Sequence, residues 1–211
     1  MKETSMTGAE AVIASCEKNG VTHVFGYPGG ANIPLFDALI DSNLKLVLSR
    51  HEQGAVHMAD GFARASGRIA LALVTSGPGA TNAITGLLTA NMDSVPLIVI
   101  CGQTVSANLG KDAFQEADVS GISYPVVKHS YLVKKTADIP RIMKEAFHIA
   151  TSGSPAPSLS TYPRMYPRRS LCPILMMPWT CLVILPSQSW MTMPLNVLLP
   201  SFLPPRNPSC S

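Results

Sequence analysis

The last 58 residues of this 211-residue chain contain no lysine, aspartate, glutamate or glycine. They hold 12 of the 18 prolines, and their only charged side chains are four arginines. Residues 1–153 carry 12 Lys and Arg against 13 Asp and Glu, a net charge of −1, so the formal +3 of the whole chain comes from the last segment. This positive charge therefore does not indicate nucleic-acid binding. The prolines remove backbone donors throughout residues 155–211, which predicts an unstructured tail behind a folded domain of residues 1–154.

Signals for export, membrane insertion and metal binding are also missing from the sequence. No basic segment followed by an apolar run opens the chain. Prolines divide the apolar stretch 171–203 into runs far shorter than the roughly 20 residues that a membrane span needs. The five cysteines lack metal-ligand spacing, and Cys16 and Cys101 are expected as small buried hydrophobes. We expect a cytoplasmic protein (or an organellar one, in the stroma of a eukaryote) with no metal site and no membrane or nucleic-acid partner.

Strand and helix patterns alternate through the first 154 residues. Apolar runs separated by helices of about 12 residues predict βαβ units and a mostly parallel sheet. The expected fold class is α/β, a doubly wound sheet with helices on both faces. A long irregular loop is expected between the fourth strand and residue 125. The predicted strands are 21–25, 44–49, 69–75, 96–101 and 126–135, and the predicted helices are 7–17, 33–39, 53–65, one ending at 91, and 139–151.

Three turns follow predicted strand ends, at residues 26–30, 50–54 and 76–79. Open α/β sheets bind their ligands at the carboxyl ends of strands, so these turns predict a crevice with a single carboxylate, that of Glu52. Glycine in such turns lets a flat ligand lie against the main chain. The turns also have a plainer interpretation as connections, and Glu52 as a helix-start acid favoured by the macrodipole. None of the three matches a P-loop, a dinucleotide fingerprint or a zinc motif.

Four motifs taken together are more specific than any one turn. They are GYPGGA at 26–31, RHEQGA at 50–55, TSGPGATN at 75–82 and DAFQE at 112–116. Their order and spacing closely resemble the amino-terminal, pyrimidine-binding domain of the catalytic (large) subunit of acetolactate (acetohydroxyacid) synthases, which are thiamine diphosphate enzymes. The resemblance covers residues 5 to about 154.

The resemblance implies a site and a reaction. Glu52 would be catalytic, hydrogen-bonding N1′ of the cofactor's aminopyrimidine so that the ring can take up a proton. The family decarboxylates pyruvate and condenses it with a second 2-oxo acid in branched-chain amino acid biosynthesis, as a homo-oligomer (dimer) with a site shared between subunits and a possible regulatory subunit. It also uses Mg²⁺ and FAD, whose binding segments we do not find here. The implied cofactor-binding residues are Gly26, Tyr27, Glu52 and Asn82, and the implied substrate-pocket residues are Gly30, Phe114 and Gln115.

The segment after the last helix departs from the family pattern. The family reads close to GPVLVDIPKDV where residues 156–166 read APSLSTYPRMY, and loss of one nucleotide near codon 156 converts one coding of the first into the second. We therefore expect a frameshifted tail, a sheet position left empty or poorly filled, and a chain inactive on its own. Three alternatives stay open: another thiamine diphosphate-dependent 2-oxo acid decarboxylase or transferase, a split-enzyme subunit whose partner chain holds the diphosphate, and a sheet protein without a ligand.

Overall fold

A six-stranded parallel sheet forms the centre of the protein in the computed structural model, which describes residues 5–163 and 170–171. The strand order is β3-β2-β4-β5-β7-β6, and every neighbouring pair runs parallel. A separate antiparallel pair joins β1 (Ser5–Met6) to β8 (Ser170–Leu171). The six sheet strands are β2 (His23–Gly26), β3 (Lys45–Leu48), β4 (Ala70–Val74), β5 (Leu97–Gln103), β6 (His129–Leu132) and β7 (Ser158–Pro163).

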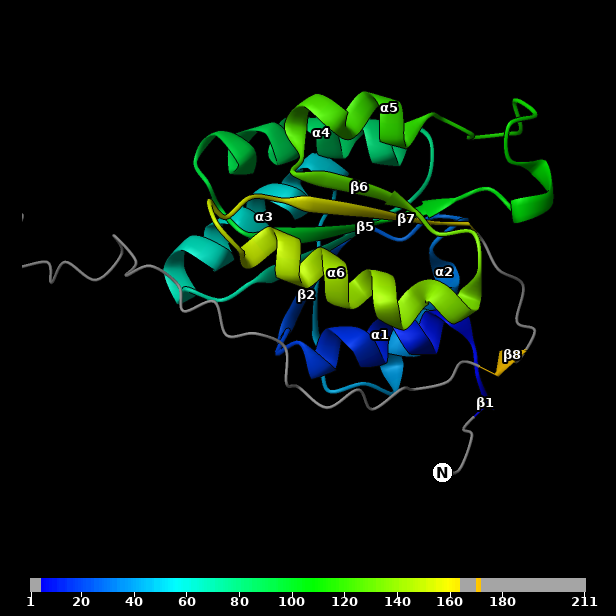
Figure 1. Ribbon diagram of the computed structural model, residues 1–211, viewed down its shortest axis with the longest axis horizontal. Coiled ribbons are helices and arrows are strands. Elements are labelled where there is room, and N and C mark those ends of the chain that lie inside the picture. Colours follow the sequence, from blue (N-terminus) through cyan, green and yellow to red (C-terminus); the bar gives the residue numbers. More distant parts are fainter. Residues whose placement is uncertain (1–4, 164–169, 172–211) are drawn as a thin grey trace, which may run out of the picture. The chain divides into compact units, whose positions relative to one another are not determined.

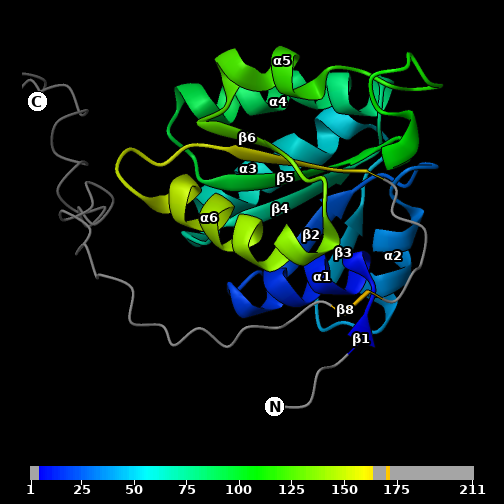
Figure 2. The ribbon, with the colours of Figure 1, turned by 45° about the vertical axis from the view of Figure 1, so that its right-hand side comes forward.

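Helices cover both faces of this sheet (Figure 1). One face carries α1 (Gly8–Lys18), α2 (Ile33–Ile40) and α6 (Ile139–Thr151). The other carries α3 (Glu52–Ser66), α4 (Pro78–Met92) and α5 (Val119–Ser123), as Figure 2 also shows. Short 3-10 turns stand at Ser106–Asn108, Tyr124–Val126 and Thr136–Asp138. The predicted doubly wound α/β fold is confirmed.

The interior strands are apolar because both of their faces are buried, as in most parallel sheets. All five residues of β4 and all seven of β5 are buried. Cys16 and Cys101 are fully buried, as predicted, and burial raises the pKa of both thiols. No helix in the described ranges is both long and apolar enough to span a bilayer.

Strand β7 corrects one prediction. The sheet position expected to be empty is occupied by Ser158–Pro163, which lies between β5 and β6 and pairs with β5 over six residues. Pairing depends on backbone groups, and β-branched Thr161 and aromatic Tyr162 are of the types enriched in strands. This strand falls within the segment predicted as tail; the rest of that prediction, on 164–169 and 172–211, lies outside the described residues.

Candidate functional site

The site lies where the sheet reverses its winding direction. From β2 the chain passes through α2 to β3 on one side, and the next strand, β4, pairs with the other side of β2. The connections after β2 and β4 then lead to helices on opposite faces of the sheet. Such a switch point leaves a crevice at the carboxyl ends of the two strands, where α/β proteins bind ligands.

The turn at residues 26–30, called the first turn from here on, is held in place by Asn32. This side chain is fully buried, accepts a hydrogen bond from the Gly29 amide (2.7 Å) and donates one to the Tyr27 carbonyl (3.1 Å). The Tyr27 amide in turn donates to the Leu73 carbonyl of β4 (3.2 Å). The turn therefore presents a fixed main chain, with Tyr27 39% exposed.

Gly26 and Gly30 play different parts in this turn. A Cβ on Gly26 would lie 2.9 Å from the Leu73 carbonyl oxygen, so only glycine fits against β4. The Gly26 carbonyl already accepts hydrogen bonds from the amide and hydroxyl of Ser49 (2.9 and 3.2 Å). Gly26 is thus part of the framework beneath the turn. Gly30 is exposed, and nothing lies within 4 Å of where its Cβ would be.

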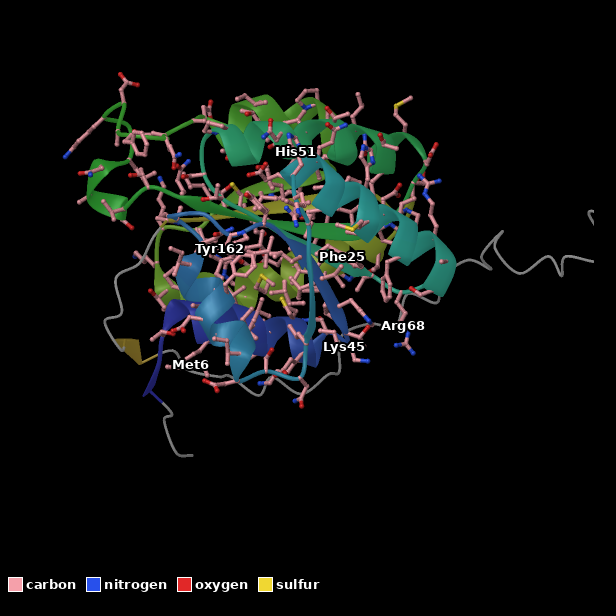
Figure 3. The ribbon with its side chains drawn as sticks, turned by 180° about the vertical axis from the view of Figure 1, so that it is seen from behind. Met6, Phe25, Lys45, His51, Arg68 and Tyr162 are labelled. Carbon is pink, nitrogen blue, oxygen red and sulfur yellow. The ribbon has the colours of Figure 1, made fainter. Side chains whose placement is uncertain are left out.

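The carboxylate of Glu52 is buried at the start of α3. The preceding residue, His51, caps the helix by accepting a hydrogen bond from the Gln53 amide at Nδ1 (3.2 Å); Figure 3 labels His51 at this helix start. Glu52 is 8% exposed, and its Oε2 accepts a hydrogen bond from Asn82 Nδ2 (3.0 Å). Asn82 lies in α4, 30 residues along the chain. The structure therefore brings two of the predicted cofactor-binding residues into direct contact.

The turn at residues 76–79, called the second turn from here on, lies directly against this carboxylate. Gly77 adopts φ +58°, a conformation that favours glycine, and the turn leads into α4. A Cβ on Gly79 would lie 3.0 Å from Glu52 Oε1 and 2.6 Å from Thr75 Cγ2. Because residue 79 is glycine, the main chain at the start of α4 can lie close to this carboxylate. A buried carboxylate and a fixed main-chain turn at a switch point fit a flat heteroaromatic ring with a ring nitrogen facing the acid.

The loop before α5 packs over the second turn. Gln115 has φ +56°, and its main chain lies so close to Gly77 that a Cβ there would be 2.9 Å from the Gln115 oxygen. Glu116 fixes the loop by accepting hydrogen bonds from the amides of Gly110, Lys111 and Ala113. These bonds lower the pKa of the Glu116 carboxyl. The loop is therefore ordered by its own carboxylate.

The three predicted substrate-pocket residues do not meet in one enclosed cavity. Phe114 is 88% exposed, Gly30 is open to solvent, and Gln115 contacts Gly77 through its main chain. A separate cavity of about 340 Å³ lies between the loop and the ends of β5, β6 and β7. Its lining is Gln103, Leu109, Gly110, Asp112, Glu116, Ala117, Asp118, Val119, Ser120, Leu132 and Thr161.

Two residues of the site, Asn32 and Thr75, are not predicted from the sequence. Asn32 had a signal, because asparagine in a turn commonly bonds nearby main-chain groups. Thr75 is 9% exposed and contacts both glycine turns. Its position under the turns depends on the pairing of β2 with β4, which no local pattern shows.

Comparisons with known proteins show the family of this domain. The family model of the thiamine pyrophosphate enzyme, N-terminal TPP binding domain, matches residues 6–122. The acetolactate synthase large subunit of Buchnera aphidicola subsp. Schizaphis graminum (strain Sg) is 56% identical over 160 residues, 75% of this chain and 28% of the relative. The acetolactate synthase isozyme 3 large subunit of Escherichia coli (strain K12) is 57% identical with the same coverage, and the acetolactate synthase large subunit of Lactococcus lactis subsp. lactis (strain IL1403) is 49% identical over 156 residues, 74% of this chain and 27% of the relative. The chain thus spans little more than a quarter of the length of the curated relatives it matches.

Proposed function

Since the chain belongs to the thiamine pyrophosphate enzyme family, as an N-terminal TPP binding domain, we propose that its switch-point crevice binds the aminopyrimidine half of thiamine diphosphate. The observation that carries this proposal is the buried Glu52 carboxylate, held by Asn82 and facing the main chain at Gly79. A carboxylate in that setting can share a proton with a ring nitrogen, here N1′. The turn at Tyr27 would supply main-chain groups to the opposite edge of the ring.

Thiamine diphosphate supplies, when bound, a nucleophilic carbon that adds to 2-oxo acids. The part of this chain is to hold the ring and to exchange a proton with it. Glu52 would hold the proton at N1′, and Asn82 would fix the rotamer of Glu52. General acid–base assistance of this kind contributes about 10²–10⁴-fold to a rate.

For the whole protein we propose acetolactate synthase activity, with pyruvate and a second 2-oxo acid as substrates. The names of the relatives support this activity, and the words "large subunit" in those names support a smaller regulatory partner. We also propose that Phe114, Gln115 and Gly30 reach substrate when the remaining parts of the site are present. Residues that bind the diphosphate, Mg²⁺ and FAD would come from segments that this chain does not supply. We therefore propose that the 211-residue chain is inactive alone.

We further propose that residues from about 156 onward are read in a shifted frame. Strand β7 supports this, because its six residues are all buried and four of them, Ser158, Ser160, Thr161 and Tyr162, carry hydroxyls. The neighbouring interior strands β4 and β5 carry no hydroxyl in their five and seven residues. Sequencing the gene across codon 156 tests the proposal. If the neighbouring reading frame does not encode the family segment there, no nucleotide was lost and the proposal is wrong.

The binding role is tested on the 211-residue chain with thiamine and with Glu52→Gln. The amide keeps the size of the side chain but cannot hold the proton that N1′ requires, so we expect thiamine affinity to fall at least tenfold in a nuclear magnetic resonance titration. Glu145→Gln is the matched control, because Glu145 pairs with Arg141 (2.8 Å) on α6, across the sheet. Equal affinity of the wild-type and Glu52→Gln chains would overturn the role of Glu52.

The enzymatic role is tested on a full-length protein with the frame restored. Acetolactate formation from pyruvate should appear in the restored protein and fall by two or more orders of magnitude in its Glu52→Gln variant. The unrepaired chain should show no turnover. Acetolactate made by the 211-residue chain alone would contradict the proposal that the remaining segments are needed.

A further inference from the structure

Thr75, the first residue after β4, lies beneath both glycine-containing turns of the site. It is 9% exposed. A Cβ on Gly29 would lie 2.6 Å from both Thr75 Cβ and Thr75 Oγ1, and a Cβ on Gly79 would lie 2.6 Å from Thr75 Cγ2. Separations under 3.0 Å are not tolerated, so the two glycines are required by this one threonine.

The two branches of the threonine face different turns. The hydroxyl is the acceptor of a long hydrogen bond from the Ala31 amide (3.4 Å), which ends the first turn. The methyl group lies against Gly79, next to which stands Glu52 Oε1. The Thr75 carbonyl meanwhile faces the Cys101 thiol of β5 (3.4 Å), so the residue is also tied to the sheet interior. A rigid link therefore runs from the first turn through Thr75 to the helix start that supports the carboxylate.

From this arrangement we infer that Thr75 is a positioning residue that sets the spacing between the main chain of the first turn and the Glu52 carboxylate. The inference rests on the proposed function, in which those two groups take opposite edges of one aminopyrimidine ring. A ring of fixed width binds well only when the gap between its two partners is fixed. A β-branched side chain suits this task because its χ1 is restricted. Thr75 itself need not touch the ligand.

The test uses the full chain and thiamine as the added ligand. Thr75→Ala removes both branches, and with them the fixed spacing between the two turns, so it should weaken thiamine binding about tenfold. Thr75→Val keeps the shape and loses only the long hydrogen bond, so it should retain most of the affinity. Thr85→Val, on an exposed position of α4, is the control and should bind as the wild type does.

A double-mutant cycle with Glu52→Gln separates positioning from general loss of structure. Positioning acts through Glu52, so Thr75→Ala should cause little further loss of affinity once Glu52 is Gln. Equal losses in both backgrounds would overturn the inference, because a merely structural role predicts additive effects. Wild-type affinity in Thr75→Ala would overturn it as well, while leaving the binding role of Glu52 in place. Absence of thiamine binding by the wild-type chain would instead overturn the proposed function, and the inference with it.

Discussion

Replacing Thr161 with valine should stabilise the protein. Thr161 is 1% exposed in β7, between Cys101 of β5 and Leu132 of β6, and its Oγ1 has no hydrogen-bond partner among the described residues. Burying a hydroxyl without a partner costs about 1–3 kcal/mol. Valine keeps the β-branch and the strand preference and removes that cost. The backbone bond from the Val133 amide to the Thr161 carbonyl (3.0 Å) does not involve the side chain.

Urea unfolding followed by circular dichroism measures this effect. The midpoint for Thr161→Val should rise at an unchanged slope, since the area exposed on unfolding hardly changes. In thermal unfolding each kcal/mol corresponds to roughly 2–4 °C for a domain of this size. Ser123→Ala is the opposite control, because the buried Ser123 hydroxyl donates to the Ser120 carbonyl (3.1 Å) and shares a second hydrogen bond with the Ser130 hydroxyl (3.2 Å). A lower or unchanged midpoint for Thr161→Val would refute the reasoning and indicate a water bound to the hydroxyl from the neighbouring cavity.

Two further changes probe the framework of the site. Gly86→Ala should destabilise the protein by about 1–3 kcal/mol, because the new Cβ would lie 2.7 Å from Val56 on α3 and force α3 and α4 apart. The control is Gly61→Ala on α3, where the new Cβ meets open space, and it should stabilise the protein by up to about 1 kcal/mol. Equal effects of the two substitutions in urea unfolding would contradict this prediction. Glu116→Gln should speed hydrogen exchange at the Gly110 and Ala113 amides near neutral pH. The pKa of Glu116 is lowered in the folded loop, so its contribution is complete above the ordinary value of 4.5 and is lost as the pH falls through the lowered one. Wild-type and Gln loops should therefore become alike in acid, and a difference that persists there would contradict the assignment.

Elements with one dominant pattern could be predicted from the sequence. Helix α6 has the predicted bounds, 139–151, because its apolar side chains recur at helical spacing and Pro140 stands in its first turn, where proline is tolerated. Strands β4 and β5 were found as uninterrupted apolar runs. The predicted strand 126–135 is only His129–Leu132, because Val126 ends a 3-10 turn and is buried there without joining the sheet.

Strand β7 could not be predicted because its residues send a mixed signal. Hydroxyl side chains and prolines are typical of a loop, while in the sheet this segment fills the position between β5 and β6. Long-range pairing outweighed local composition. The short helix α5, within the predicted irregular loop, could not be predicted either, because it also depends on long-range packing. Val119 packs against the face covered by α4, a contact that no spacing in the loop reveals.

The features of the site also divide into those that a local sequence pattern predicts and those that depend on long-range packing. Glu52 could be predicted because a lone acid after a strand is visible in the sequence. Its contact with Asn82 joins residues of two helices, α3 and α4, and their adjacency depends on the order of the strands in the sheet. Motif order places both residues near a switch point, but the 3.0 Å bond depends on how closely α3 and α4 approach. Gly86 sets that approach, since any larger residue would meet Val56. The carboxylate's orientation is therefore a property of helix packing some distance from it, which is why a substitution at Gly86 should disturb Glu52 as well as the fold.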